Sequence, residues 1–112
     1  MSTQATTPTP TTRILAIGTI NPGVDQANVF EILPNEVPET VNLYLDGKID
    51  ECYSLQDRRG VVFILNVTDH TVAHEMLEKL PLVQAHLMSF ELIPLGPLNP
   101  LRRLPGMTPK PQ

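Results

Sequence analysis

The sequence has no tryptophan, one cysteine and no long apolar run. A single cysteine, Cys52, cannot form an intrachain disulfide and cannot supply a zinc site built on several thiolates. A membrane span needs about 18 or more apolar residues, and a secretory signal needs a basic start followed by an apolar stretch. The sequence contains neither pattern, so we expect a cytoplasmic protein with no membrane partner.

Basic residues are also scarce. Eight Lys and Arg stand against twelve Asp and Glu, giving a formal net charge of −4, and the tight basic pairs are Arg58-Arg59 and Arg102-Arg103. Nucleic-acid binding requires a basic stripe that neutralises phosphates. The composition therefore predicts no nucleic-acid partner.

At 112 residues and 41% hydrophobic, the chain has room for a single core. Residues 1–12 contain six Thr, two Pro and no charge, so we expect a disordered N-terminal tail. Residues 96–112 are too rich in proline for a helix or a strand. The three-residue spacing of Leu98, Leu101 and Leu104 suits a polyproline-like C-terminal arm that lies in a groove of a neighbouring subunit. Simple disorder is the alternative. The predicted domain is residues 13–95.

Alternating or continuous β-branched and aliphatic residues predict four strands, at 13–20, 49–56, 61–67 and 88–95. Asp69 is placed to cap a helix that ends at Pro81 and buries Ala73, Met76, Leu77 and Leu80.

Residues 26–47 are helical in composition but contain Pro34 and Pro38, each of which removes a backbone donor. We therefore predict two helices, a short one at 26–33 and a second from about 35 to Gly47. The second helix has apolar residues at helical spacing, which predict its buried stripe: Val37, Val41, Tyr44 and Leu45.

The predicted order is βαββαβ, an α+β ferredoxin-like fold whose four-stranded antiparallel sheet carries both helices on one face. The other sheet face still carries apolar side chains, which a single chain would expose to water. Exposed apolar patches of this kind usually mark an interface. We therefore expect a homodimer, or a higher homo-oligomer, formed through the sheet face.

Several stretches together carry a resemblance: Gly47-Lys48 before a strand, a hairpin, VVFILNV, the helix HEMLEKLPL, and a strand ending in Ile93-Pro94-Leu95. This arrangement resembles the muconolactone isomerase family of the dimeric α+β barrel superfamily. The resemblance implies a pocket beside the sheet and a proton-transfer isomerisation of a small lactone or enolisable compound, without metal or organic cofactor. This chain departs from the family at Asp50 and Glu51, where the family's second strand is basic; a pocket built there would repel a carboxylate.

Six residues are candidates for the site. Proton transfer needs an acid or base and a donor for the developing enolate. The candidate catalytic groups are therefore Glu91 on an apolar strand, His74 on the helix and the Tyr53 phenol. The candidate substrate-binding groups are Arg58, Glu51 and Ser89. Each also has a plainer interpretation, which is a partly buried, hydrogen-bonded side chain for His74 and a solvated side chain for the others.

No metal site is predicted, because His70 and His74 lack a third ligand and HEMLE is not the HExxH zinc motif. The alternative to an isomerase is a non-catalytic oligomeric or small-ligand-binding barrel, since one fold hosts many functions. An antibiotic-biosynthesis type of oxygenase is a third hypothesis, weakened by the few aromatic residues.

Overall fold

The fold is taken from a computed structural model, which describes residues 10–98. The elements in chain order are β1 (Arg13–Ile20), α1 (Gln26–Leu45), β2 (Ile49–Ser54), β3 (Gly60–Leu65), α2 (His70–Glu78), α3 (Pro81–Gln84) and β4 (Met88–Leu95). The predicted strands 13–20 and 88–95 are confirmed. Most of the predicted N-terminal tail and C-terminal arm, residues 1–9 and 99–112, lie outside the described residues.

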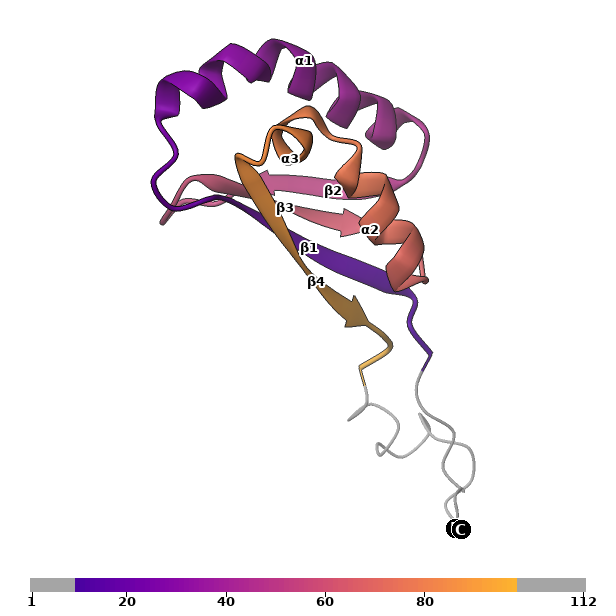
Figure 1. Cartoon of the computed structure of the whole chain (residues 1–112). Helices are drawn as coiled ribbons and strands as arrows, with labels where there is room; N and C mark the ends of the chain where they lie inside the picture. The colour runs from indigo at the N-terminus through magenta and orange to yellow at the C-terminus, as the bar shows by residue number, and fades with distance from the viewer. Residues whose placement is uncertain (1–9, 99–112) are drawn as a thin grey trace, which may run out of the picture.

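The four strands form one antiparallel sheet in the order β2-β3-β1-β4, and the helices all lie on one of its faces (Figure 1). This is the ferredoxin-like α+β fold that the sequence predicted. The two strands at the centre of the sheet, β1 and β3, are the most apolar, as expected for strands with neighbours on both sides.

The core lies between the sheet and the helices. Ile14 and Ala16 of β1 are fully buried there, beside Leu65 of β3. At Gly18, a Cβ atom would lie 2.5 Å from the Phe90 ring, so this ring packs directly on the β1 backbone. Glycine at this position allows β4 to carry a large aromatic side chain toward the core.

Helix α1 corrects the prediction of two separate helices. It runs without interruption from Gln26 to Leu45 and includes both Pro34 and Pro38. The two prolines are exposed and four residues apart, so they share the solvent face of the helix. Because proline has no backbone N–H, some carbonyls of the preceding turn lack a partner, and on this face they can bond water. The helix arches over the sheet (Figure 1). The local cost of proline was therefore not enough to break the helix.

The predicted buried stripe of α1 is also wrong. Val37, Val41, Tyr44 and Leu45 are 54, 46, 51 and 73% exposed, whereas the buried residues of α1 are Val29 and Glu36. The helix packs against α3 and β2 through a neighbouring face, so the apolar stripe borders open space instead of the core. Periodicity identified an apolar stripe but could not say which face the rest of the fold would cover.

Helix α2 begins as predicted. The Asp69 side chain accepts a hydrogen bond from the Thr71 backbone N–H at 2.7 Å, and Ala73 and Leu77 are buried. Pro81 does follow the end of α2, but it also opens the short helix α3. The N-cap residue of α3, Leu80, has no side chain that can cap the helix.

Strand β2 contains a bulge that breaks its predicted alternation. Ile49 pairs with Leu65 but Glu51 pairs with Ile64, so one residue, Asp50, is additional. Ile49 therefore points into the core, whereas Glu51 lies on the opposite face of the sheet. Simple alternation along residues 49–56 would have placed these two side chains on one face, and the bulge separates them.

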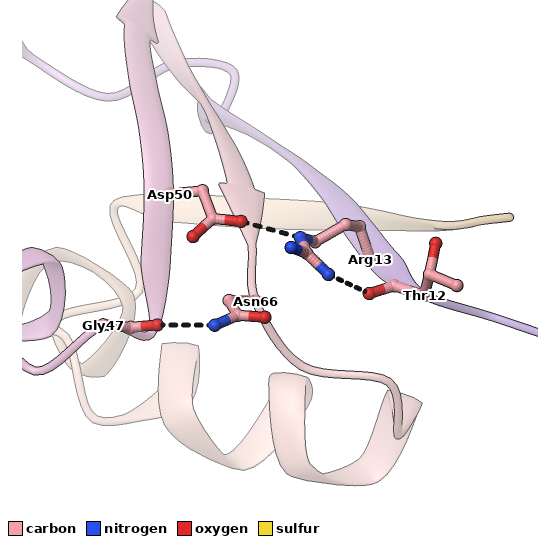
Figure 2. A network of polar contacts seen from close by, with 5 residues as sticks. All are labelled: Thr12, Arg13, Gly47, Asp50 and Asn66. Atoms are coloured by element: carbon pink, nitrogen blue, oxygen red, sulfur yellow. Dashed lines mark hydrogen bonds and ion pairs between the residues drawn. The ribbon is translucent and has the colours of Figure 1, made fainter. Parts of the chain in front are cut away.

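The bulge is held by polar contacts at one end of the sheet (Figure 2). The Arg13 Nε donates to Asp50 Oδ2 at 2.7 Å, and another guanidinium N–H donates to the Thr12 carbonyl at 2.8 Å. The Asn66 amide donates to the Gly47 carbonyl at 3.2 Å. These contacts tie the starts of β1 and β2 together past the end of β3.

The face of the sheet opposite the helices is apolar at its centre. The register places these side chains on it: Leu15 and Ile17 of β1, Val62 and Ile64 of β3, and Ile93 and Leu95 of β4. All six are only partly buried. Within residues 10–98, no helix has the length and apolar character needed to cross a membrane.

Candidate functional site

A cavity of about 430 Å³ lies between α1 and the β2–β3 side of the sheet. Its walls are mainly apolar, and they include Val29 and Leu33 of α1, Phe63 of β3 and Met88 of β4. The cavity exists because α1 rests on α3 and β2, and so arches above the sheet instead of lying flat on it. Its size and apolar walls are typical of small-molecule sites.

Glu36 is the one charged side chain that is buried in the described part of the chain, at 7% exposure, and it lines this cavity. Burial raises the pKa of the Glu36 carboxyl above its ordinary value, because the charged form loses its hydration. A hydrogen bond from the Leu82 backbone N–H opposes this effect, and the nearby charge of Glu39 adds to it. The buried carboxyl therefore holds its proton at a higher pH than an exposed one.

The Glu36 carboxyl also has a structural role. Its Oε1 accepts the Leu82 N–H at 2.8 Å, which satisfies one of the free N–H groups in the first turn of α3. Leu80 cannot cap α3, so a residue of α1 performs this task. A hydrogen bond from the Thr40 side chain also stabilises the charged form of this carboxyl.

Other polar groups border the cavity, namely Thr40 of α1, Cys52, Tyr53 and Ser54 of β2, and Arg59 of the β2–β3 loop. The predicted cation, Arg58, is placed differently. Its guanidinium pairs with the adjacent Asp57 at 3.2 Å and is exposed. Arg59 is therefore the arginine of this pair that lies beside the cavity.

The predicted residues Tyr53, Glu51 and Glu91 belong to the open sheet face. The Tyr53 hydroxyl donates to the Glu51 carboxylate, and this hydrogen bond raises the pKa of the phenol. Tyr53, Val62, Ile17 and Glu91 form one row across the sheet. Three strand spacings separate its ends, about 14 Å. A single chain therefore does not bring Tyr53 and Glu91 into contact.

His74 and Ser89 border a second cavity of about 230 Å³, between α2 and the start of β4. The His74 Nε2 lies 3.6 Å from Glu78 Oε2, and the Ser89 hydroxyl donates to the Asn21 side-chain oxygen at 2.6 Å. This cavity is separate from the one that contains Glu36. The six predicted residues are thus distributed over the open sheet face, the β2–β3 loop and this second cavity, and of the six only Tyr53 also borders the Glu36 cavity. Among residues 10–98, no group of three or more His, Cys, Asp and Glu side chains is arranged to hold a metal ion.

Comparison with known families agrees with this architecture. The family model described as muconolactone delta-isomerase matches residues 16–99, which is more than half of the chain. The chain belongs to the muconolactone delta-isomerase family. The match extends the resemblance found in residues 47–95 to include β1 and α1. The search of individual curated proteins gave no match.

The family match includes α1 and therefore the cavity that sequence reasoning missed. Glu36 lies between Pro34 and Pro38, in the first turn of the predicted second helix, and the buried stripe predicted for that helix does not include it. One signal was available. Residues 29, 33, 36, 40 and 43 recur at helical spacing, and Glu36 is the charged member of a set otherwise made of Val29, Leu33, Thr40 and Leu43.

Proposed function

We propose that this member of the muconolactone delta-isomerase family is a cofactor-independent isomerase that moves a double bond in a small lactone or enolisable carbonyl compound. The observation that carries this proposal is Glu36, a buried carboxyl with a raised pKa in the wall of the apolar cavity beneath α1. Proton transfer to and from carbon is fastest when the pKa of the catalytic acid or base lies near the working pH. Burial moves the Glu36 pKa in that direction.

In the proposed reaction, the Glu36 carboxylate removes a proton from a carbon next to the substrate carbonyl. The electron pair of the broken C–H bond forms a new C=C bond, and the carbonyl oxygen gains the negative charge of an enolate. The protonated Glu36 then returns the proton to the far carbon of the conjugated system, which completes the shift of the double bond. The Leu82 N–H keeps one carboxyl oxygen in place during both transfers.

Arg59 is the proposed partner of the substrate oxygen or of an anionic group on the substrate. Asp50 and Glu51, which would repel a carboxylate, are not among the residues that line this cavity. An anionic substrate is therefore compatible with the Glu36 site, although the sequence of β2 argued against it.

The proposal is tested by Glu36→Gln, which keeps an oxygen for the Leu82 N–H but cannot carry the proton. Muconolactone and an uncharged unsaturated lactone would be incubated with the protein in D2O, and isomerisation and deuterium incorporation followed by NMR. We expect Glu36→Gln to lower the rate by roughly 10²- to 10⁴-fold. Glu31→Gln, an exposed acid on the same helix, is the matched control and should retain the rate.

An unchanged rate in Glu36→Gln would reject Glu36 as the proton carrier, and Glu91→Gln would then test the open sheet face. Failure of the wild-type protein to exchange any of these compounds would instead favour the non-catalytic, ligand-binding alternative. Thermal-shift measurements with the same compounds separate these cases, because a ligand that binds the folded state raises the melting temperature.

We also propose that two copies pair through the open sheet face to form the dimeric α+β barrel. The apolar centre described above has a polar rim that includes Arg13, Glu51 and Glu91, which is the usual composition of an interface. In such a dimer, the apolar centre of this face would lie inside the barrel, and Glu51, Tyr53 and Glu91, which lie on the edge strands, would remain at its rim. We propose a cytoplasmic location, since the exposed Cys52 thiol would be kept reduced there.

A further inference from the structure

An exposed apolar groove runs along α1 beside the free edge of β2. A cavity of about 390 Å³ at this position is lined by Val41 and Tyr44 of α1 and by Cys52 and Tyr53 of β2. Val41, Cys52 and Tyr53 also line the Glu36 cavity, so the two hollows are neighbours. We call this surface the α1–β2 groove. Its aromatic members, Tyr44 and Tyr53, are 51 and 58% exposed.

We propose that residues 99–107 of the same chain occupy the α1–β2 groove as an extended, polyproline-like segment. The proposal concerns the chain's own segment, not that of a second copy, and it does not depend on the isomerase function.

The spacing of apolar residues in this segment fits the groove. Leu98, Leu101, Leu104 and Met107 recur every three residues, with prolines at 97, 100 and 105. A polyproline helix has three residues per turn, so these four side chains share one edge. Proline-rich segments of this type are bound by grooves lined with aromatic side chains. Leu98, the last described residue, is 61% exposed and is free to begin such a contact.

Charge complementarity supports the same occupant. Residues 99–112 contain Arg102, Arg103 and Lys110 and no acidic residue. The groove is lined at one end by Asp50 and Glu51, which are the acids that made β2 unusual in sequence. A segment that enters at this end would bring Arg102 and Arg103 close to them.

The chain can reach the groove at this end. Arg13 pairs with Leu95, and Arg13 contacts Asp50, so β4 ends on the same side of the sheet on which β2 begins. Three strand spacings, about 14 Å, separate β4 from β2. Six residues, 96–101, span about 19 Å in a polyproline conformation. Leu101 can therefore reach the groove from its own strand, and residues 102–107 can continue along it.

The lone cysteine of the chain lies in the groove and provides a direct test. In the full-length variant Leu104→Cys, we expect oxidation to join positions 52 and 104 within one chain, giving a faster-migrating monomer on non-reducing electrophoresis and one cross-linked peptide by mass spectrometry. Thr6→Cys, in the N-terminal segment, is the matched control and should not give this product. A covalent dimer joined through positions 52 and 104, or no cross-link at all, would overturn the proposal.

A second measurement does not require a new cysteine. The rate of Cys52 alkylation by N-ethylmaleimide would be compared between the wild-type chain and Leu101→Ser/Leu104→Ser. We expect a rise of about tenfold in the double variant, which corresponds to a groove covered about 90% of the time in the wild type. Asn99→Ser/Thr108→Ser changes positions off the apolar edge and should leave the rate unchanged. Equal rates in all three proteins, with unchanged circular dichroism spectra, would contradict docking.

Discussion

Glu36 is a carboxylic acid on the face of α1 that otherwise packs apolar side chains. Loss of hydration favours its neutral form, and the hydrogen bond from Leu82 favours the charged form. The pKa is raised, so desolvation is the larger effect. A group in this position links protein stability to pH, because the folded chain holds its proton more tightly than the unfolded chain.

The sign of this linkage can be tested. Since the folded-state pKa lies above the ordinary value of 4.5, the free energy of unfolding should fall as the pH rises from about 4.5 through the folded-state pKa. Glu36→Gln removes this titration, so its stability relative to the wild type should increase over the same pH range. Urea unfolding at several pH values measures the difference, with Glu31→Gln as the control. Parallel pH profiles for the wild type and Glu36→Gln would contradict the assignment.

At the scale of the element, α1 is a 20-residue helix that tolerates two prolines because both lie on its exposed face. Asp25 caps its start by accepting the Ala27 N–H at 3.1 Å. The helix touches α3 and β2 and leaves an apolar stripe uncovered. Packing against α3 and β2, and not helix propensity, therefore determines where α1 lies.

The prolines should still reduce the stability of the helix. Pro38→Ala restores a backbone donor in the helix interior, a gain of about 3 kcal/mol on propensity scales, and releases up to about 1 kcal/mol of chain entropy in the unfolded state. We expect a net rise of about 1–2 kcal/mol in the free energy of unfolding, measured by urea denaturation. Pro22→Ala, in the turn after β1, has no helical bond to restore and should slightly lower stability. A fall in stability for Pro38→Ala would show that the arch of α1 needs its proline.

At the scale of the whole molecule, the helices cover one face of the sheet and leave the other to solvent (Figure 1). Ile17 lies near the centre of the uncovered face, between Val62 and Glu91 in its row. Small soluble domains rarely leave a contiguous apolar face exposed to water. Pairing through the sheet would add core to a chain whose single hydrophobic layer is small.

A charge at the centre of this face should prevent pairing. We expect Ile17→Glu to convert the proposed dimer to a folded monomer, because an unpaired carboxylate would have to be buried between the two sheets. Light scattering coupled to size-exclusion chromatography measures the change. Val72→Glu places the same charge at an exposed apolar position of α2 and is the matched control. A wild-type chain that is already a monomer at micromolar concentration would reject the barrel.

Much of the secondary structure followed from local chemistry. The strands 13–20 and 88–95 were predicted at their observed bounds, because continuous β-branched and aliphatic residues end at turn residues such as Asn21-Pro22-Gly23. The cap at Asp69 was predicted for the same kind of local reason. The position of the candidate site was not predicted. Glu36 is far in the chain from Cys52 and Arg59 of the β2–β3 hairpin, and their approach depends on the packing of α1 on α3 and β2.

The sequence by itself determined the βαββαβ order, the family and an apolar sheet face, because turn signals, strand periodicity and side-chain polarity are local properties. Only the tertiary structure decided which face of α1 is buried, where β2 shifts register at Asp50, and that Glu36 lies in a cavity wall. These features depend on contacts between segments that are distant in the chain. The orientation of α1, for example, must satisfy the burial of its apolar side chains and the hydrogen bonding of its polar ones at the same time. The bond between Glu36 and Leu82, which joins residues 46 positions apart, is the clearest example.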